Sequence, residues 1–426
     1  MERFKVQVKD GKACEKILAV EVGEEEIRNE FDHFYQTIAP QAKIPGFRPG
    51  RAPRDVLEMH YQREAHDHVL KHLIQESFRE ALQQAALDPL TQPVIQDVDF
   101  KEKKKLTYKA VIEIRPKIKL SRVKGLSAKK VKAEVKEEDV QRQLKGVQES
   151  FAKYRAAEGR GVQLGDHVIA DYVCRVDQKE IDKRESDWLE MRPDHFLKGF
   201  VEGILGMQAG ETRQIQASFP SDFAREDLAG KTADFSITVK EIKTKDLPAL
   251  DDELAKDAGN FKSLDELIDK TRKDLQQAGD RETEAVFENA LLDELCKHNK
   301  IDLPRGVVAQ RIEFLLEQTR NQSMRRGMPE TEFEKQKPEL MKSLEVEARK
   351  QVHLAFLLDE IAQTENLRAE ESDLAKKYQE MADRIRQPVD KVRQYYEEHE
   401  QAKESLKEQI RSERAVEFIK MNAKLK

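Results

Sequence analysis

The spacing of the hydrophobic residues changes near residue 248, and no other feature of this sequence constrains the fold as strongly. Before that point apolar and polar residues alternate in several short runs, such as 168–176, which is the pattern of half-buried β-strands. From 248 to 426 the apolar residues recur at the spacing of amphipathic helices, with Glu and Lys between them. We therefore expect a multidomain α+β protein whose C-terminal part is all-α.

The polarity of the chain constrains how its parts can pack. It has 426 residues, of which 37% are charged and 38% are hydrophobic. This length predicts two to four domains, and so few apolar residues cannot fill one large spherical core. Small cores joined by long helices fit better, so we expect the all-α part to be elongated. Disorder is the alternative for a polar chain, but regularly spaced Leu, Ile, Val and Phe residues favour a folded protein.

Turn residues and changes of period divide the chain into four segments. Segment 1–116 is expected to be a small α/β domain, because alternating strands flank two helical stretches and Pro116 ends the last strand. A Lys- and Glu-rich connector at 117–150 ends in a helical pattern and is expected to pack with the C-terminal domain. A β-rich domain with Gly-rich turns follows at 151–247, and a helical domain occupies 248–426.

Several elements can be placed within these segments. The strands and helices expected in the first domain are 4–8, 18–22, 24–38, 54–87 and 108–114. Two capping-box patterns, at 263–266 and 331–334, are predicted to start helices of the last domain. Breaks between its helices are expected at Pro304, Pro329, Pro338 and Pro388.

Several classes of protein are excluded. The net charge of −6 is unlike that of a dedicated nucleic-acid binder, so any RNA contact must come from a local basic patch. No run of about 18 apolar residues suggests a membrane span, and no signal-peptide pattern opens the chain. Three scattered cysteines argue against a disulfide framework, and no Walker-type nucleotide motif occurs. We expect a cytoplasmic protein that contacts no membrane and needs no cofactor.

Three histidines lie within one predicted helix: His66, His68 and His72. His68 and His72 are one helical turn apart, a spacing that can bind a metal. No third ligand pattern such as His-Glu-x-x-His accompanies them. We therefore interpret them as a polar helix face and expect no metal site.

A basic loop is the first candidate site. Residues 43–54 carry four basic side chains and no acidic one, and their glycines and prolines predict a shaped loop with Phe47 at its tip. The guanidinium groups of Arg48, Arg51 and Arg54 suit phosphate oxygens, with which each can form two charge-assisted hydrogen bonds. The alternative is a solvated basic turn in which Phe47 folds back on its own domain.

The loop resembles the signature of the bacterial trigger factor family, Gly-Phe-Arg-x-Gly-x-x-Pro. The matching residues are Gly46, Phe47, Arg48, Gly50 and Pro53. The resemblance extends to the chain length and domain order, and it implies docking beside the ribosomal tunnel exit, on a ribosomal protein and adjacent ribosomal RNA. The residues expected to bind the ribosome are Ile44, Gly46, Phe47, Arg48, Gly50, Arg51 and Pro53.

Segment 151–247 resembles the FKBP-type peptidyl-prolyl isomerases, best at 196–203, which reads Phe-Leu-Lys-Gly-Phe-Val-Glu-Gly. The resemblance implies a proline pocket with Phe200 as its floor and Leu197 beside it. The full set of expected pocket residues is Tyr172, Asp182, Trp188, Leu197, Phe200, Phe223 and Phe235. Amide rotation has a barrier of about 18–20 kcal/mol. A dry aromatic pocket lowers this barrier without a nucleophile, by binding the twisted imide better than the planar one.

The segment departs from the FKBP pattern at several positions. Ile181, Asp182 and Lys183 stand where trigger factors have Phe-Glu-Gly, and Cys174 and 192–194 replace expected glycines. A plain β-domain core would also require aromatic residues here. The domain is therefore expected to act either as a prolyl isomerase or mainly as a second peptide-binding surface.

The resemblance gives the helical domain its expected role, because this region meets unfolded chains in the family. Its methionines suit adaptable contacts, although most are expected to be ordinary core or surface residues: Met324, Met328, Met341, Met381 and Met421.

We interpret the protein as an ATP-independent chaperone that docks at the ribosomal exit tunnel, holds nascent and unfolded polypeptides and assists their folding. The resemblance also implies a homodimer as an option when the protein is free. The alternative function is an FKBP-type prolyl isomerase that uses its helical arms only to recruit substrates. A scaffold or a periplasmic isomerase-chaperone is a further alternative, and the missing signal sequence argues against the periplasmic form.

Overall fold

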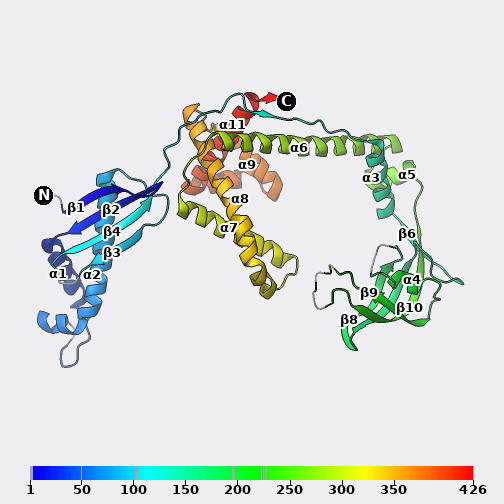
Figure 1. The fold of residues 1–426 in the computed structure, drawn as a ribbon, viewed down its shortest axis with the longest axis horizontal. Helices are drawn as coiled ribbons and strands as arrows, with labels where there is room; N and C mark the ends of the chain where they lie inside the picture. Colours follow the sequence, from blue (N-terminus) through cyan, green and yellow to red (C-terminus); the bar gives the residue numbers. More distant parts are fainter. Residues whose placement is uncertain are drawn as a thin grey trace. The chain divides into compact units, whose positions relative to one another are not determined.

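The computed structural model describes residues 3–48, 50–100, 104–193, 197–221, 223, 225 and 228–425. The chain forms two compact units, the first spanning 1–130 and 285–426 and the second spanning 131–284. A small α/β part, a β-rich part and a long helical part are all present (Figure 1). The predicted multidomain α+β class is therefore confirmed.

A four-stranded antiparallel sheet with the order β1-β2-β4-β3 lies in the N-terminal part of the first unit. Its strands are β1 (Phe4–Asp10), β2 (Glu15–Val22), β3 (Val94–Asp99) and β4 (Leu106–Glu113). β2 and β4 bury alternate residues, as the period of two predicts. β3 is almost entirely exposed, so its sequence shows no apolar alternation and does not predict a strand.

Two helices, α1 (Glu24–Ile38) and α2 (Arg54–Ala85), cover one face of this sheet (Figure 1). α1 turns a stripe of large residues toward the sheet, as its helical spacing predicts. α2 is fixed to β4 by a buried hydrogen bond, in which Ser77 Oγ and Tyr108 Oη are 2.8 Å apart. This packing holds the ends of both helices and therefore both ends of the loop between them.

The helical part of the first unit contains the last turns of α6 (Leu264–His298) and the helices that follow it. These are α7 (Arg305–Arg325), α8 (Glu330–Thr364), α9 (Glu371–Ile385), α10 (Val389–Glu398) and α11 (Glu400–Met421). Leu126 and its neighbours join the core between α6, α8 and α11. Beside it, β5 (Ser127–Ala128) pairs in parallel with β11 (Lys424–Leu425). Residues 424–425 therefore form a short strand, where the sequence predicts helix throughout.

Prolines mark most of the predicted helix starts. Pro304, Pro329 and Pro388 are the N-cap residues of α7, α8 and α10. The prediction for Pro338 is wrong, because this residue lies inside α8 and does not break it. Pro338 is exposed, so water can satisfy the carbonyl group of Glu334, which loses its intrahelical donor.

The two capping-box predictions have different outcomes. Ser263 precedes α6, and its Oγ accepts a hydrogen bond from the backbone N–H of Glu266 at 3.3 Å. This confirms Ser263 as a helix start. Thr331 lies instead within α8, which begins at Glu330 after Pro329 with no side-chain cap. The N-cap residue of α8 is therefore Pro329, and the prediction that Thr331 caps this helix is wrong.

A five-stranded sheet is the centre of the second unit. Its strands are β6 (Lys153–Ala156), β7 (His167–Val176), β8 (Lys179–Glu190), β9 (Thr212–Ser218) and β10 (Thr232–Asp246). They follow the path β6-β10-β7-β8, with β9 paired to β10. β7 and β10 bury alternate residues, as predicted. The Gly-rich stretch after β8 contains the short helix α4 (Phe200–Ile204), where the sequence predicts only turns.

The second unit also contains a small helical cluster. α3 (Glu137–Ser150) and α5 (Asp252–Gly259) pack against the first turns of α6 through Val140, Leu144, Ala255 and Leu267. The 117–150 connector therefore contributes to two cores, its first half to the one that contains Leu126 and its helix α3 to this one.

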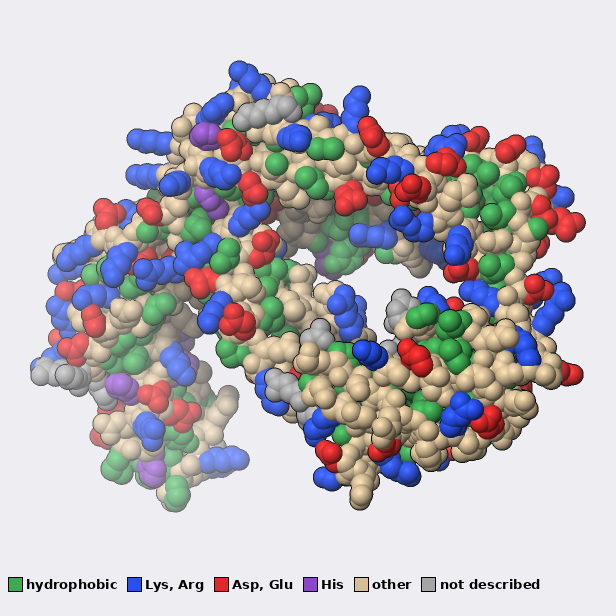
Figure 2. Space-filling model, turned by 45° about the vertical axis from the view of Figure 1, so that its right-hand side comes forward, with side chains coloured by type: hydrophobic (Ala, Val, Ile, Leu, Met, Phe, Trp, Pro, Cys, Tyr) green, Lys and Arg blue, Asp and Glu red, His purple; other side chains and the backbone are tan. Residues whose placement is uncertain are grey.

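The surface mixes both signs of charge. Basic and acidic side chains are interspersed over the face in view, with hydrophobic side chains visible between them (Figure 2). This agrees with the small net charge of −6. Among the described residues, no helix has the length and apolar character that crossing a membrane requires.

Candidate functional site

The basic loop between α1 and α2 is anchored at its base. Ile44 is 5% exposed and packs in the core of the N-terminal sheet and helices. The backbone N–H of Lys43 donates to the hydroxyl of Tyr61 at 3.3 Å, at the point where α2 departs from helical geometry. The loop therefore starts from a fixed position on the domain.

Two tight turns shape the rest of the loop. The N–H of Phe47 donates to the carbonyl of Ile44 at 3.1 Å, and the N–H of Arg51 donates to the carbonyl of Arg48 at 2.9 Å. Gly46 and Gly50 have φ angles of 88° and 79°. Side chains disfavour this left-handed region, so both glycines of the sequence signature have a conformational reason.

The tip of the loop presents an aromatic ring and two arginines to solvent. Phe47 is 41% exposed, and Arg48 and Arg51 are exposed. Among the described residues, no carboxylate pairs with Arg48 or Arg51. Pro53 is also exposed and is the N-cap of α2, whereas Pro49 lies outside the described residues. The exposed ring disagrees with the alternative in which Phe47 is buried against its own domain.

Arg54 has a different role from the one predicted. Its guanidinium donates to Asp32 Oδ1 at 2.9 Å, pairs with Glu58, and lies over the ring of Tyr35 with Cζ 4.0 Å from the centroid. Its charge is thus already used to hold α2 against α1. Arg48 and Arg51 remain as the arginines of this loop that suit an anionic surface.

Three of the predicted pocket residues form an aromatic cluster in the second unit. The rings of Phe200 and Phe235 meet edge to face with centroids 4.9 Å apart, and Tyr172 lies 6.3 Å from Phe200 and 6.0 Å from Phe235. These contacts join α4, β7 and β10 in one hydrophobic core. All three residues are buried, with Phe200 only 1% exposed. The cluster is consistent with a pocket floor and with an ordinary core.

Asp182 lies beside this cluster. Its position on β8 is directly opposite Cys174 on β7, and its Oδ2 accepts a hydrogen bond from the hydroxyl of Tyr172 at 3.3 Å. Burial, followed by the nearby Asp182 and Asp187, raises the pKa of Tyr172 to about 12. The phenol therefore stays protonated and can donate a hydrogen bond at any physiological pH.

Leu197 and Phe223 are partly buried at the edge of the same core. Phe223 packs on Phe219 with ring centroids 4.7 Å apart. Phe196, which opens the FKBP-like motif, lies outside the described residues. Ile181, which stands where trigger factors have phenylalanine, is partly buried against the core.

The prediction that Trp188 lines the pocket is wrong. Trp188 pairs with Ile169, whereas the core-facing residues of β7 include Val168, Ala170 and Tyr172. Residues directly opposite each other in a sheet share a face, so Trp188 lies on the outer face and is 48% exposed. Its ring contacts are with Tyr154 and His167, at centroid distances of 5.3 and 6.3 Å, and with Lys243.

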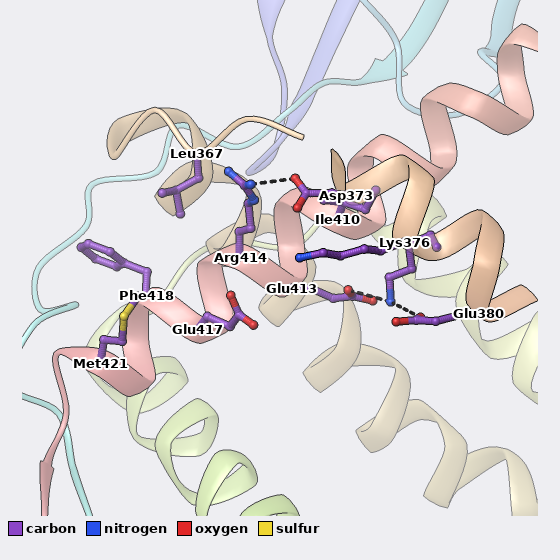
Figure 3. Close-up of a pocket in the computed structure, with 11 residues that line it drawn as sticks. Leu367, Asp373, Lys376, Glu380, Ile410, Glu413, Arg414, Glu417, Phe418 and Met421 are labelled. Atoms are coloured by element: carbon purple, nitrogen blue, oxygen red, sulfur yellow. Dashed lines mark ion pairs between the residues drawn. The ribbon is translucent and has the colours of Figure 1, made fainter. Parts of the chain in front are cut away.

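A cleft of about 520 Å³ lies between α9 and α11 in the helical part (Figure 3). Its walls are joined by ion pairs from Arg414 to Asp373 at 2.7 Å and from Lys377 to Glu413 at 2.9 Å. Leu367, Phe418 and Met421 line one end of it (Figure 3), and Met421 is 79% exposed. The sequence does not predict this cleft, because most of its lining comes from two helices that are not adjacent in the chain.

Comparison with known proteins agrees with these features. Residues 4–147 match the family described as bacterial trigger factor protein (TF), and residues 263–421 match its C-terminal region. Residues 158–240 match the FKBP-type peptidyl-prolyl cis-trans isomerases. The chain is similar to the trigger factor of Syntrophotalea carbinolica, with 31% identity over 423 residues that cover 99% of this chain and 96% of the relative.

Two further similarities extend the comparison. The trigger factor of Geobacillus thermodenitrificans is 34% identical over 361 residues, which cover 83% of this chain and 84% of the relative. A solved structure from a study of substrate recognition by the trigger factor chaperone aligns with 97% of this chain and 98% of its own, with 20% identity and a TM-score of 0.50, and it supports the fold. The chain thus belongs to the bacterial trigger factor family, ribosome-associated chaperones with an FKBP-type peptidyl-prolyl cis-trans isomerase domain.

Proposed function

We propose that this protein docks beside the ribosomal tunnel exit through residues 44–53 and holds nascent polypeptides as they emerge. The main support is the exposed ring of Phe47 beside Arg48 and Arg51, two arginines that have no acidic partner among the described residues. Ile44 anchors the loop in the domain core, and Gly46 and Gly50 give it its turns.

The two kinds of side chain fit the two components of a ribosomal surface. Arginine binds phosphate oxygens of ribosomal RNA through paired hydrogen bonds, and an aromatic ring fills an apolar pocket on a ribosomal protein. Full burial of a phenylalanine side chain contributes about 1.5–3 kcal/mol. Phosphate contacts weaken as salt rises because counterions compete, so binding should depend on ionic strength.

We infer that the helical domain holds unfolded polypeptides through exposed apolar side chains. Phe314 on α7 is 50% exposed, and Met341 and Val346 on α8 are 43% and 71% exposed. At about 25 cal/mol per Å² of apolar surface, a few such contacts hold a client only transiently. The client leaves when folding buries its own apolar residues, so no ATP is needed. In a homodimer of the free protein, two copies can cover each other's exposed Phe314, Met341 and Val346.

The proposed division of labour follows four segments: 1–116 binds the ribosome, 117–150 packs with the C-terminal domain, 151–247 is the isomerase domain and 248–426 holds clients. We place the protein in the cytoplasm, where nascent chains leave the ribosome.

For the isomerase domain, we propose that a prolyl side chain binds at the edge of this core, beside the partly buried Leu197 and Phe223, with the packed ring of Phe200 as the floor beneath them and Tyr172 and Phe235 as walls. The Tyr172 hydroxyl and the Asp182 carboxylate form a polar edge next to these rings. This edge is a feature that an ordinary apolar core does not need, and it favours peptide binding at this place.

Co-sedimentation with 70S ribosomes tests the docking proposal. The Phe47→Ala, Arg48→Ala double variant should lose binding that the native chain shows at moderate salt. The control is Val8→Ala, Lys9→Ala, which removes another exposed apolar and basic pair of the same domain and should leave binding unchanged. Equal binding by both variants and the native chain would refute the assignment of the loop.

A deletion of 151–247 separates the chaperone from the alternative, a prolyl isomerase whose helices only recruit substrates. The chaperone proposal predicts that the shortened chain still suppresses the aggregation of an unfolded client. Loss of suppression together with loss of isomerase activity would favour the alternative.

A further inference from the structure

Two carboxylates and an imidazole converge between α1 and α2, away from the basic loop. His72 and Glu76 are one turn apart on α2, and Glu30 faces them from α1. One ligand atom from each side chain lies within 4.8 Å of the other two. We propose that Glu30, His72 and Glu76 bind a divalent first-row metal ion, of which Zn²⁺ is the best-fitting representative.

The position of Glu30 fits a metal ligand better than a residue that only hydrogen-bonds to His72. Its side chain is only 13% exposed, and its Oε1 lies 3.0 Å from Nδ1 of His72. That oxygen is nevertheless buried without a hydrogen-bond partner, although the imidazole lies within ion-pair distance of it. Two atoms bound to the same tetrahedral ion at about 2.0–2.2 Å lie roughly 3.3–3.6 Å apart. The 3.0 Å distance is therefore close to that of two neighbouring ligands, and an ion would compensate the buried carboxylate oxygen.

The donor set selects the class of ion. Imidazole is a ligand of zinc and other first-row metals, whereas calcium and magnesium take oxygen ligands. One nitrogen and two carboxylates supply three protein ligands and leave one position of a tetrahedral ion for water. His72 is 49% exposed and Glu76 is 36% exposed in their side chains, so an ion can reach the site from solvent.

The sequence does not reveal this site, because its third ligand comes from another helix. The histidines nearest to His72 in the chain do not take part. His66 packs against Phe100, and His68 packs against Phe34, each with ring centroids 5.0 Å apart. The spacing of the histidines therefore does not identify the ligands of this site. The second and third ligands are the carboxylates of Glu30 and Glu76, and no second histidine is needed.

Arg3 competes with a metal for this site. Its Nη1 donates to Glu76 Oε1 at 3.0 Å, and its Nη2 donates to Glu26 Oε2 at 2.8 Å. An ion bound by Glu76 must displace or share this contact. Removing the guanidinium should free the carboxylate and tighten metal binding. A bound ion would join α1 to α2, the two helices that carry the basic loop between them.

Calorimetric titration of the untagged, EDTA-treated full chain with ZnCl₂ tests the proposal. We expect one Zn²⁺ site whose affinity falls in His72→Gln and in Glu30→Gln. Removing a residue that hydrogen-bonds to a metal ligand already lowers metal affinity about 10- to 100-fold. Removing a ligand should therefore lower the affinity at least as much. His60→Gln, which removes an exposed histidine of α2, is the matched control and should bind as the native chain does. Arg3→Gln should bind more tightly.

The outcomes are distinct. Equal binding by His72→Gln and the native chain, or no binding by the native chain, would overturn the site. Urea unfolding in EDTA shows whether each variant is folded, and Glu30→Gln provides a second test because it keeps the shape of the side chain. A rise in the unfolding midpoint with ZnCl₂ in the native chain, absent in both ligand variants, would support the site independently.

Discussion

Replacing Phe200 by alanine should strongly destabilise the isomerase domain. The side chain is 1% exposed, and its ring meets that of Phe235 at 4.9 Å and that of Tyr172 at 6.3 Å. Truncation of a phenylalanine packed in this way costs about 3–5 kcal/mol in the free energy of unfolding. An open pocket floor would lose less, because much of its surface is already in contact with water. The size of the loss therefore distinguishes a packed ring from an open one.

Trp188 provides the assay. It is the single tryptophan of the chain and lies in β8 of this domain, so its fluorescence follows unfolding of this domain within the full-length protein. With a slope of about 1–3 kcal/mol per M urea, the expected loss lowers the midpoint by about 1–5 M. Phe314→Ala removes an exposed ring of the helical domain and should leave this transition unchanged. A loss below about 1 kcal/mol for Phe200→Ala would refute the packing argument.

Three further predictions concern the loop and the isomerase domain. Arg48→Ala should weaken ribosome binding and its salt dependence without lowering the thermal stability. Arg54→Ala should instead lower the free energy of unfolding by about 0.5–1 kcal/mol, because it removes exposed ion pairs and a ring contact. Co-sedimentation with ribosomes measures the first effect and calorimetry measures the second. Gly46→Ala should weaken ribosome binding about 5- to 30-fold, because about 1–2 kcal/mol of strain arises at a φ of 88°; unchanged affinity would show that the turn does not matter. Burial holds the pKa of His167 below its usual 6.5, so the folded domain resists protonation and should lose stability as the pH falls below 6.5. This loss, followed by Trp188 fluorescence, should be absent in His167→Gln, and an equal loss in both proteins would contradict the prediction.

The sequence predicts the buried elements of this protein better than the exposed ones. β2, β4, β7 and β10 bury one face, so their apolar residues alternate and the strands can be recognised. β6 is exposed along its whole length, and it forms because β10 offers it a backbone partner. Hydrophobic periodicity contains no information about such pairing.

The predicted basic loop agrees with the structure better than the predicted proline pocket does, for a similar reason. The basic loop is a local feature, so the turns at Gly46 and Gly50 and the exposed ring of Phe47 follow from neighbouring residues. The position of Trp188 depends instead on the register of β8, which shifts twice against β7. A shift of one residue turns a side chain to the other face, and the sequence does not reveal where such shifts occur.

The role of Arg54 could not be predicted either. Its sequence neighbours are the same basic loop residues that surround Arg51. Its partners Asp32 and Tyr35 come from α1, and only the packing of α1 on α2 brings them to it.

Photo-crosslinking from position 47 shows whether the loop itself contacts the ribosome. A photoreactive phenylalanine analogue replaces Phe47 in the full chain, and the same analogue at Val8, another exposed position of the domain, serves as the control. On 70S ribosomes, we expect position 47 to crosslink to a ribosomal protein or ribosomal RNA and position 8 not to crosslink. Ribosome-bound protein that crosslinks from position 8 but not from position 47 would show that the loop is not the docking site.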